Sequence, residues 1–591
     1  MMNKNTKNCF RTIKTLFMYV KLSAIATVAM QFILAIIPST ITILSERLYN
    51  EISVFLSHGA TSENKLIFIV SMFLIVYFVS NFCQFLLSFS INIGIYEKGT
   101  NLFKTKLAEK SSHLPLISYE NGNTLDMLER ANKCVEREIP STIFMSSIGI
   151  VMKLVNVLSI LLVLISYDIS FLPISILSIF PFYIAKKIRG DEFYDLKYGQ
   201  ARDRRKVQYF WNLFTEKESV REMRVMSFSN YIADKWTVIR DEVNVKTWNY
   251  NIKEANSYFL CDVIRVLGYM SSLLISIYLF IFGKISIGHL AAALNAFSGM
   301  QIATKDFFVK LADLRNNSKF INDYYDFLSL PEEKYGSIDV KTANKLTVNH
   351  VSFKYPGVDK YILSNIDLSL SYGEKVAIIG ENGSGKSTLC KILLGLYKPT
   401  NGNVCIDEYN LNDLSSVSRE RIFSIVSQHF ERYKFLLYEN VGISDVSNII
   451  DGQKIIDVLL QSDLPKYSDS EKIETQLGRE YGGTELSGGE WQKLSIARCL
   501  FKESSSIVIL DEPTSALDPM IESKIMNQFL EISKDKISII VLHRLGLCKH
   551  MDKIIVMNGG KIVEIGKHDE LMKLKGEYYK LYSEQEKWYK N

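Results

Sequence analysis

Six apolar runs without Asp, Glu, Lys or Arg dominate the first half of this 591-residue chain. They cover residues 22–45, 66–96, 154–167, 169–185, 266–283 and 285–304. A helix needs about 20 mostly apolar residues to cross a bilayer, and the third run reaches that length if its helix begins near Thr142. Helices this apolar would be a liability for a protein dissolved in water. We therefore predict six membrane-spanning helices.

Basic residues between the runs predict how the chain crosses the membrane. Five of them precede the first run, and the long connections between spans two and three and between spans four and five are rich in Lys and Arg. The other connections are short and carry few basic residues. Because Lys and Arg concentrate on the cytoplasmic side, we predict a multi-pass protein of the cell membrane with a cytoplasmic N-terminus. Both long connections show helical spacing, with polar tips near 118–128 and 226–236.

Composition excludes several other classes of protein. The formal net charge of +5 is small for this length, and no basic patch interleaved with aromatic residues indicates a nucleic-acid partner. The eight cysteines form no C-x-x-C pair. Scattered cysteines indicate reduced thiols rather than a disulfide framework or a zinc site.

The second half contains a phosphate-binding loop between a strand and a helix. The apolar segment "EKVAIIG" (374–380) leads into "GENGSGKST" (380–388), and "LCKILLGL" follows with a helical pattern. Glycines in such a loop let backbone N–H groups surround phosphates. Lys386 supplies a positive charge and the Ser387 hydroxyl can bind Mg²⁺. The pattern predicts an α/β P-loop domain that binds ATP with Mg²⁺.

A second apolar segment, "SSIVILDEPTSALD" (505–518), ends in two carboxylates. In this position Asp511 would hold Mg²⁺. Glu512 could accept a proton from the attacking water as a general base. The spacing after the P-loop favours this interpretation over an ordinary acidic loop.

A third motif, "LSGGE" (486–490), is another site for an anion, because a serine and two glycines precede a helical pattern. One nucleotide has one set of phosphates, and the P-loop already surrounds them. We therefore expect Ser487, Gly488 and Gly489 to bind the nucleotide of a second copy of the domain. Glu490 is expected only to favour the helix N-terminus.

These motifs resemble those of the ATP-binding-cassette (ABC) transporters. In that family "GENGSGKST" corresponds to Walker A, "LSGGE" to the signature motif, and "ILDEPTSALD" to Walker B with the D-loop. The resemblance implies that Gln428 senses Mg²⁺ and the attacking water, that His543 contacts the γ-phosphate, and that Tyr355 stacks on adenine. The implied nucleotide-binding residues are Tyr355, Gly380, Asn382, Gly383, Ser384, Gly385, Lys386, Ser387, Thr388, Asp511, Ser487, Gly488 and Gly489. The implied catalytic residues are Glu512, His543 and Gln428, and Ser387, Gln428 and Asp511 would hold the metal.

The whole chain resembles the exporters in which membrane and cassette domains are fused as a half-transporter. This implies a transmembrane domain over 1–325 with six helices and long cytoplasmic extensions, followed by an ATP-binding cassette domain over 326–591 in the cytoplasm. The loop tips would be the coupling helices of the family. A homodimer is predicted and a heterodimer is possible. Membrane lipid and an exported peptide or amphiphile are the other expected partners.

The segment "LGREYGGTELSGGEWQKLSIAR" (477–498) is similar to the transporters of lantibiotics and related modified peptides. Glu490 stands where glutamine is usual, and Leu542 stands where Thr or Ser is frequent. Three functions stay open: export of a (modified) peptide such as a bacteriocin or lantibiotic, export of a lipid or amphiphilic drug, and an ATP-dependent membrane sensor or immunity component. Near the start of the fifth span, Asp262 and Arg265 are expected to form a structural ion pair.

Overall fold

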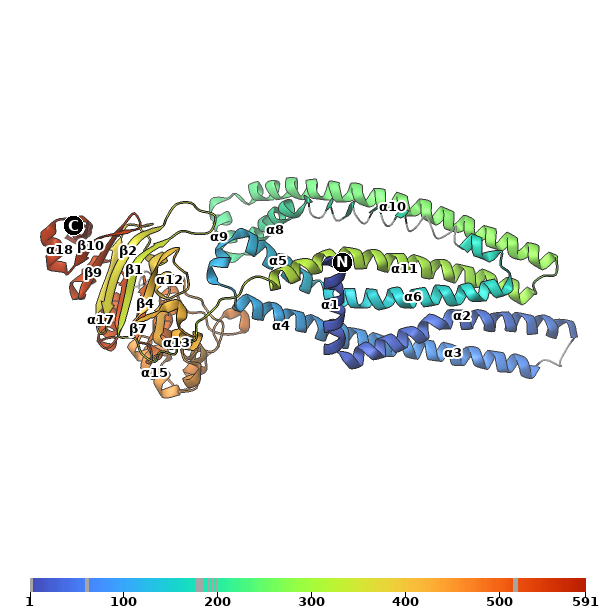
Figure 1. Cartoon of the computed structure of the whole chain (residues 1–591), viewed down its shortest axis with the longest axis horizontal. Helices are drawn as coiled ribbons and strands as arrows, with labels where there is room; N and C mark the ends of the chain where they lie inside the picture. The colour runs from blue at the N-terminus through green and yellow to red at the C-terminus, as the bar shows by residue number, and fades with distance from the viewer. Residues whose placement is uncertain are drawn as a thin grey trace. The chain divides into compact units, whose positions relative to one another are not determined.

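The computed structural model describes residues 4–58, 63–175, 184–185, 188–189, 192–193, 195–196, 199–513 and 519–590. The chain divides into two compact units (Figure 1). The first comprises Met1–Ser112 and Leu125–Leu330, and the second comprises His113–Thr124 and Pro331–Asn591. The segment His113–Thr124 therefore belongs with the C-terminal unit, although it lies far from it in the sequence.

The first unit consists of helices. They are α1 (Lys4–Tyr19), α2 (Lys21–His58), α3 (Glu63–Phe89), the π-helix η2 (Ser90–Glu97), α4 (Lys98–Ser112), α5 (Gly122–Glu136), α6 (Ile139–Tyr167), α8 (Ala201–Thr215), α9 (Lys217–Met226), α10 (Ser229–Ile281) and α11 (Ile287–Leu328). Helix α10 has 53 residues. At 1.5 Å per residue it is about 80 Å long, more than twice the hydrocarbon thickness of a bilayer. This helix extends well beyond a membrane, as the mixed charge of its N-terminal half predicts.

Four stretches of the described residues are long and apolar enough to cross a membrane: Lys21–Leu56, Glu63–Ser112, Ile139–Tyr167 and Ser229–Ile281. The fourth predicted span, 169–185, falls largely outside the described residues. The sixth predicted span lies within α11, which carries His289, Asn295 and Gln301 in its apolar stretch and is not among the four. A helical membrane domain is therefore present, and the number six stays a prediction.

The polar tips of the long connections are shorter than predicted. The first non-α segment includes a 3₁₀ helix, η3 (Leu116–Glu120), and α5 begins at Gly122, inside the predicted tip. The second break is confined to Ser227 and Phe228, where Ser227 has a φ of 58°, and α10 begins at Ser229. Residues after Gly122 and Ser229 are polar enough to suggest a loop, but they are helical in the structure. Polar residues can still favour a helix.

The sequence predicts only the cytoplasmic location of the N-terminal residues, from their positive charge, whereas the structure shows that they form helix α1. It packs along α11 through polar contacts: Asn8 Nδ2 donates to Asn322 Oδ1 at 2.7 Å, and the hydroxyls of Thr12 and Tyr325 lie 3.2 Å apart. The Arg11 guanidinium lies over the ring of Tyr325 at 4.5 Å.

The expected ion pair in the membrane unit is present. Arg265 Nη2 lies 3.3 Å from Asp262 Oδ1, and Lys305 Nζ lies 3.7 Å from the same oxygen. Asp262 is thus shared by two basic groups from α10 and α11, which supports the structural interpretation.

The second unit contains two sheets. An antiparallel sheet has the order β2-β1-β4-β5, and a six-stranded sheet has the order β10-β9-β3-β8-β7-β6, in which β9, β3, β8, β7 and β6 are mutually parallel. The strands are β1 (Lys345–Phe353), β2 (Leu363–Ser371), β3 (Lys375–Gly380), β4 (Asn401–Ile406), β5 (Tyr409–Asn410), β6 (Phe423–Val426), β7 (Ile507–Asp511), β8 (Ile537–Val541), β9 (Lys553–Asn558) and β10 (Lys561–Gly566). Strands β7 and β8 are buried along their full length, as expected when helices cover both faces of a parallel sheet.

Helices complete the second unit. They are α12 (Lys386–Leu393), α13 (Ser416–Ile422), α14 (Leu437–Gly442), α15 (Gly452–Gln461), α16 (Gly488–Phe501), α17 (Pro519–Ile532), α18 (His568–Leu574) and α19 (Glu577–Lys590). A helical region before α17 packs around the buried Trp491 of α16, in the cluster that includes Leu437 and Ile455. The fold is therefore an α/β nucleotide-binding domain that follows a helical membrane domain.

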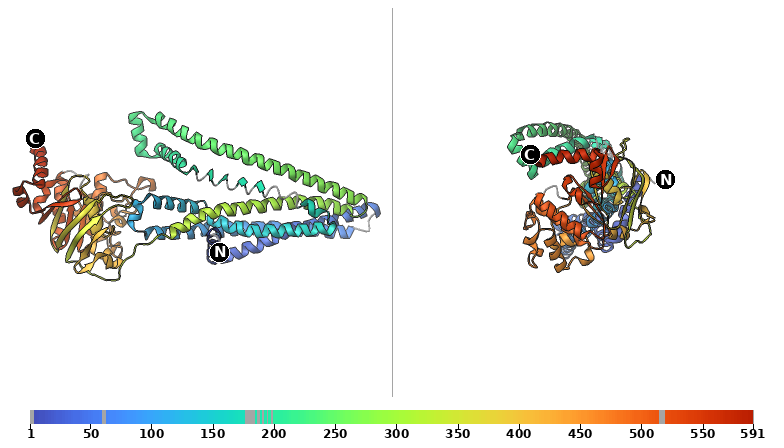
Figure 2. Two further views of the ribbon diagram at one scale, coloured as in Figure 1. Left: turned by 45° about the horizontal axis from the view of Figure 1, so that its top comes forward. Right: turned by 90° about the vertical axis from the view of Figure 1, so that its left-hand side faces the viewer.

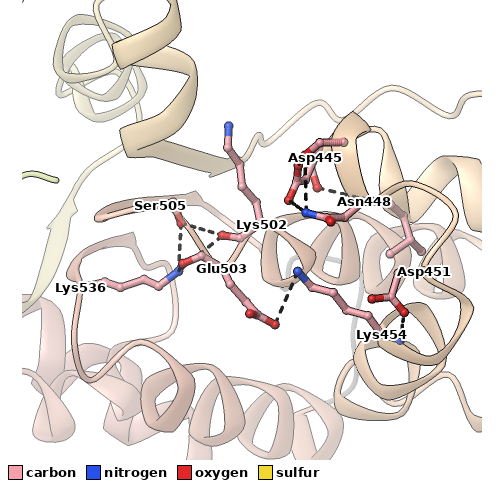
Figure 3. Close-up of polar contacts among 11 residues, drawn as sticks. Asp445, Asn448, Asp451, Lys454, Lys502, Glu503, Ser505 and Lys536 are labelled. Carbon is pink, nitrogen blue, oxygen red and sulfur yellow. Dashed lines mark hydrogen bonds and ion pairs between the residues drawn. The ribbon is translucent and has the colours of Figure 1, made fainter. Parts of the chain in front are cut away.

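The amino ends of β7 and β8 carry a polar network (Figure 3). Lys536 Nζ donates to Ser505 Oγ at 3.0 Å and to the carbonyl of Glu503 at 2.9 Å. Lys454 Nζ lies 3.6 Å from Glu503 Oε1. Lys536 satisfies a backbone carbonyl where the chain enters the sheet, and Lys454 pairs with the carboxylate of the same residue, so we assign the network a structural role.

Candidate active site

Sheet topology brings the predicted catalytic segments together. Strands β3, β8, β7 and β6 are neighbours in that order and run parallel. The P-loop follows β3, Asp511 ends β7, and His543 and Gln428 come two residues after β8 and β6. Since the carboxyl ends of parallel strands share one edge, these segments meet there. Ligands of open α/β sheets bind at that edge.

The P-loop depends on backbone conformations that suit glycine. Gly383 and Gly385 have φ values of +80° and +101°, in the left-handed region. A Cβ added at Gly380 would lie 2.1 Å from the carbonyl oxygen of Met557, whereas a Cβ at Gly383 would have nothing within 4 Å. The loop is thus held tightly against β9 at one end and is open at its tip.

The P-loop fits a polyphosphate. Ser384 is 4% exposed, and its Oγ is buried without a hydrogen-bond partner in the described part of the chain. Lys386 Nζ donates to the carbonyls of Gly380 at 2.9 Å and Glu381 at 3.0 Å, so the lysine lies across its own loop. Burial lowers the pKa of Lys386 from its ordinary value, and an anion beside it would oppose that shift. The residues therefore offer unmet donors to phosphate oxygens.

The pair predicted to hold Mg²⁺ is in contact. Ser387 Oγ donates to Asp511 Oδ1 at 3.3 Å. Burial raises the pKa of Asp511, and the neighbouring carboxylate of Glu512 adds to that effect. A divalent cation would relieve both effects, and a hydroxyl beside a carboxylate is a donor set that suits Mg²⁺. Ser387 and Asp511 therefore fit the metal.

Glu512 lies at the centre of the site. Its backbone has a φ of 52°, which is uncommon for a residue other than glycine. Gln428 Nε2 donates to Glu512 Oε2 at 2.8 Å, and His543 Nε2 lies 2.5 Å from Oε1. The three side chains, with Asn382, line a cavity of about 470 Å³. Glu512 is thus oriented by two side chains from the neighbouring strands.

Two charged residues that line this cavity, Glu522 and Arg544, are not indicated by the sequence, and neither is Gln585, which lies outside the cavity and contacts its lining. Glu522 of α17 is 5% exposed and forms an ion pair with Arg544, which follows His543. Gln585 of α19 donates to the carbonyl of His543 and accepts from the N–H of Leu545 at 2.9 Å. These contacts join distant segments, so no local pattern could have indicated them.

Tyr355 belongs to a group of aromatic rings beside the P-loop. Its hydroxyl lies 3.3 Å from Thr388 Oγ1, and its ring meets those of Phe353 and Tyr397 edge-on at 5.1 and 5.9 Å. The Tyr397 hydroxyl donates to Glu120 of η3. The aromatic predicted to contact adenine is therefore linked through Tyr397 to the His113–Thr124 segment, a connection that the sequence did not indicate.

Ser487, Gly488 and Gly489 do not line the cavity around Glu512. Ser487 is the N-cap of α16: its N–H donates to Glu490 Oε2 at 2.8 Å, and the Glu490 N–H donates to Ser487 Oγ at 3.3 Å. This capping box gives Glu490 the helix-terminal role that was expected. Residues 514–518, which include the predicted D-loop, lie outside the described residues.

Comparisons with known proteins agree with this architecture. The family model "ABC transporter" matches residues 363–515. The chain is 31% identical over 582 residues to the subtilin transport ATP-binding protein SpaT of Bacillus subtilis, covering 95% of this chain and 92% of that protein. It is 29% identical to the nisin transport ATP-binding protein NisT of Lactococcus lactis subsp. lactis, covering 97% and 95%. An ATP-dependent lipid A-core flippase of Idiomarina loihiensis is 29% identical over 58% of this chain and 60% of that protein.

A bacterial Atm1-family ABC exporter with ATP bound has the same fold, with a TM-score of 0.78 over 97% of this chain and 98% of that one at 17% identity. Both halves of the chain thus have counterparts in one class of transporter. The protein belongs to the ABC transporter family, as an exporter that couples ATP hydrolysis to transport across a membrane.

Proposed function

We propose that this protein exports a peptide, namely a modified peptide such as a bacteriocin or lantibiotic. The similarity to the subtilin transport protein carries this proposal, since it extends over 582 residues and so includes the membrane unit as well as the cassette. The flippase match covers 352 residues. Cargo contacts in such a transporter belong to the membrane unit, so similarity there bears most on cargo.

We propose that ATP lies on the P-loop with its adenine against Tyr355. Backbone N–H groups of residues 380–388, the Ser384 hydroxyl and Lys386 would bind the phosphates. The unpartnered Ser384 Oγ and the open tip at Gly383 support this assignment. The P-loop residues with this role are Gly380, Asn382, Gly383, Ser384, Gly385, Lys386, Ser387 and Thr388.

For hydrolysis we assign the proton acceptor to Glu512. Its carboxylate would take a proton from water attacking the γ-phosphate, while Gln428 and His543 hold the carboxylate in place. Ser387 and Asp511, with Gln428, would hold Mg²⁺, which supplies positive charge against the phosphate oxygens. The hydrogen bonds to Glu512 are the observation that favours this assignment over Asp511 as the base.

We propose a homodimer that hydrolyses ATP at two shared sites. Ser487, Gly488 and Gly489 lie outside the cavity of their own chain, with Ser487 and Gly488 exposed at the start of α16. The partner's Ser487, Gly488 and Gly489 would close over the nucleotide held by this chain's P-loop. The helix start that they form is suited to an anion.

We propose six spans per chain, a transmembrane domain over 1–325, a cassette over 326–591, and a cytoplasmic N-terminus and cassette. The basic residues that flank the apolar runs support this orientation. Transport would then be outward.

Reconstitution tests the function. In inside-out vesicles, ATP should drive uptake of a peptide cargo encoded beside the gene, and the same peptide should stimulate ATP hydrolysis. Uptake only of a fluorescent phospholipid, with no response to peptide, would assign the protein to lipid export. Accumulation in right-side-out vesicles instead would reverse the direction.

A further inference from the structure

A cavity of about 220 Å³ lies inside the membrane unit, apart from the nucleotide site. Residues of α2, α3, α6 and α11 line it, among them Gln31, Lys153, Asn156 and Lys310. Helices α6 and α11 run side by side there (Figure 2). The volume is below the roughly 300–1,000 Å³ of usual ligand pockets. The cavity therefore suits one residue of a larger cargo rather than a whole peptide.

The charges around this cavity do not balance. Lys153 Nζ lies 2.8 Å from Asp306 Oδ2, so this pair is neutral as a whole. Lys310, one helical turn after Asp306 on α11, makes no hydrogen bond or ion pair within the part of the chain that the structure describes. Lys310 is half-buried and lies six residues past the predicted sixth span, and a lysine ammonium attracts an anion at short range. The lining thus presents one ammonium group without a counter-ion.

Gly149 allows Lys310 to occupy this place. A Cβ added at Gly149 would lie 2.7 Å from Lys310 Cδ and 2.9 Å from Cε. The stem of the lysine therefore crosses α6 where α6 has no side chain. Lys310 Nζ would lie 3.2 Å from the same Cβ, so the ammonium also lies beside this glycine.

Asn156 provides a second, independent observation. It is 7% exposed and lines the cavity, and its Oδ1 is buried without a hydrogen-bond partner among the residues that the structure describes. Buried polar atoms in folded proteins nearly always have a partner. The missing partner of an amide oxygen is an N–H or O–H donor.

We propose that this cavity binds an acidic residue of the exported peptide, with its carboxylate on Lys310 and a peptide N–H on Asn156 Oδ1. The inference rests on the proposed peptide export. A peptide supplies both an acceptor for the ammonium and a donor for the amide oxygen. A fatty carboxylate supplies only the acceptor, so the pair of unmet groups favours a ligand that carries both an acceptor and a donor, as a peptide does.

Full-length protein in phosphatidylcholine nanodiscs can test this. The probes are a lauroylated pentapeptide with a central glutamate, its glutamine twin, and lauric acid, each with a diazirine in the acyl chain. The readouts are photolabelling of α6 and α11 and the concentration that half-maximally stimulates ATP hydrolysis. We expect the glutamate peptide to act at about tenfold lower concentration than its twin, as one charge-assisted hydrogen bond implies.

The variants separate the two contacts. Lys310→Gln should abolish the preference for glutamate, and Asn156→Ala should abolish the preference for peptide over lauric acid. Gly149→Ala should weaken only the preference for glutamate, because its Cβ would displace Lys310. Lys305→Gln is the matched control, because Lys305 lies on the same helix beside Asp262 and does not line the cavity. It should keep the full preference.

The outcomes distinguish the site from the function. A glutamate preference that survives in Lys310→Gln, or no preference in the unaltered protein, overturns the proposed site even if peptide is exported. A second outcome is that lauric acid labels the helices in a Lys310-dependent manner while peptide has no effect. That result would support the contact between Lys310 and an anion and would contradict a peptide cargo. If added phosphatidylglycerol displaces the glutamate peptide and labels the same helices, the site belongs to lipid headgroups and the proposal fails.

Discussion

At the scale of single residues, Glu512 combines an uncommon backbone conformation with the proposed role of general base. Its left-handed φ of 52° would be unfavourable in an ordinary loop. Gln428 and His543, each following a neighbouring strand, hold the carboxylate from both sides. The conformation is therefore fixed by the sheet around it rather than by local preference.

Replacing this carboxylate should separate binding from hydrolysis. Glu512→Gln is expected to bind ATP normally and to lose about 10²–10⁴-fold in turnover, the usual cost of a positioned base. Turnover and nucleotide trapping measure the two effects. Glu490→Gln is the matched control, because glutamine can replace glutamate in a capping box. Near-normal turnover in Glu512→Gln would assign the base elsewhere.

A second residue, Asp463, gives a prediction about pH. It accepts hydrogen bonds from Lys493 Nζ of α16 at 2.7 Å and Lys524 Nζ of α17 at 2.6 Å, and these bonds lower its pKa. A lowered pKa stabilises the fold at pH values above the unfolded value, about 3.9. That contribution disappears as the pH falls through the folded value.

Asp463→Asn should therefore lower the melting temperature at pH 7 by about 1–3 °C, as expected for a partly exposed ion pair. The difference from the unaltered protein should shrink as the pH falls below about 4. Intrinsic fluorescence of the full-length protein during heating measures it. Asp535→Asn, at an exposed position in the turn before β8, should show neither effect. A difference that grows toward low pH would contradict the assignment.

At the scale of elements, the short helix η3 (Leu116–Glu120) belongs to the cassette unit although its neighbours belong to the membrane unit. Ile117 packs against the core that contains Phe353 and Tyr397, and Glu120 accepts a hydrogen bond from the Tyr397 hydroxyl. Lys391 Nζ lies 3.7 Å from the same carboxylate. This segment corresponds to the first coupling tip that the resemblance implied.

Tyr397→Phe should loosen this connection without disturbing the aromatic rings. The hydrogen bond to a charged group contributes roughly 1.5–3 kcal/mol. Amide exchange of residues 116–120 should therefore accelerate about tenfold or more, and cargo should stimulate ATP hydrolysis less. Tyr409→Phe, outside this contact, is the control. Unchanged exchange at 116–120 would mean that apolar packing alone holds the segment.

At the scale of the whole molecule, the two motifs predicted to bind phosphate have separate positions in one chain. The P-loop, Asp511 and Glu512 meet at the carboxyl edge of the sheet, whereas Ser487 begins α16 outside that cavity. One intact copy of each motif in one chain suits two identical chains that complete each other's sites.

A mixing experiment tests the shared sites. Chains with Lys386→Ala are combined with chains with Ser487→Arg. In a mixed dimer one site carries both changes and the other carries neither, so each mixed dimer should trap about half of the normal nucleotide, and an equal mixture with random pairing about a quarter. Each variant alone should trap little. Hydrolysis by unaltered monomers, with no recovery on mixing, would reject the shared sites.

The sequence alone determined the features that depend on local pattern. Apolar runs of membrane length, the strand–loop–helix around Lys386 and the carboxylates after an apolar strand each depend on neighbouring residues, so membrane domain, P-loop cassette and family could be predicted. Three of the predicted spans have counterparts in α2, α3 and α6, and a fourth lies in α10. The predicted tips, 118–128 and 226–236, extend past the starts of α5 at Gly122 and α10 at Ser229, because polarity there reflects exposure and not the end of a helix.

Only the tertiary structure decided what joins distant segments. The order of the parallel strands brings Gln428, Glu512 and His543 within hydrogen-bond reach, and it adds Glu522 and Arg544, which no motif indicated. The unmet groups of Lys310 and Asn156 likewise appear only when α6 lies against α11. A pattern in the sequence indicates which local conformation and which environment, apolar or polar, each residue favours. Contacts between residues far apart in the sequence depend on packing, because the whole fold determines which faces of helices and strands meet.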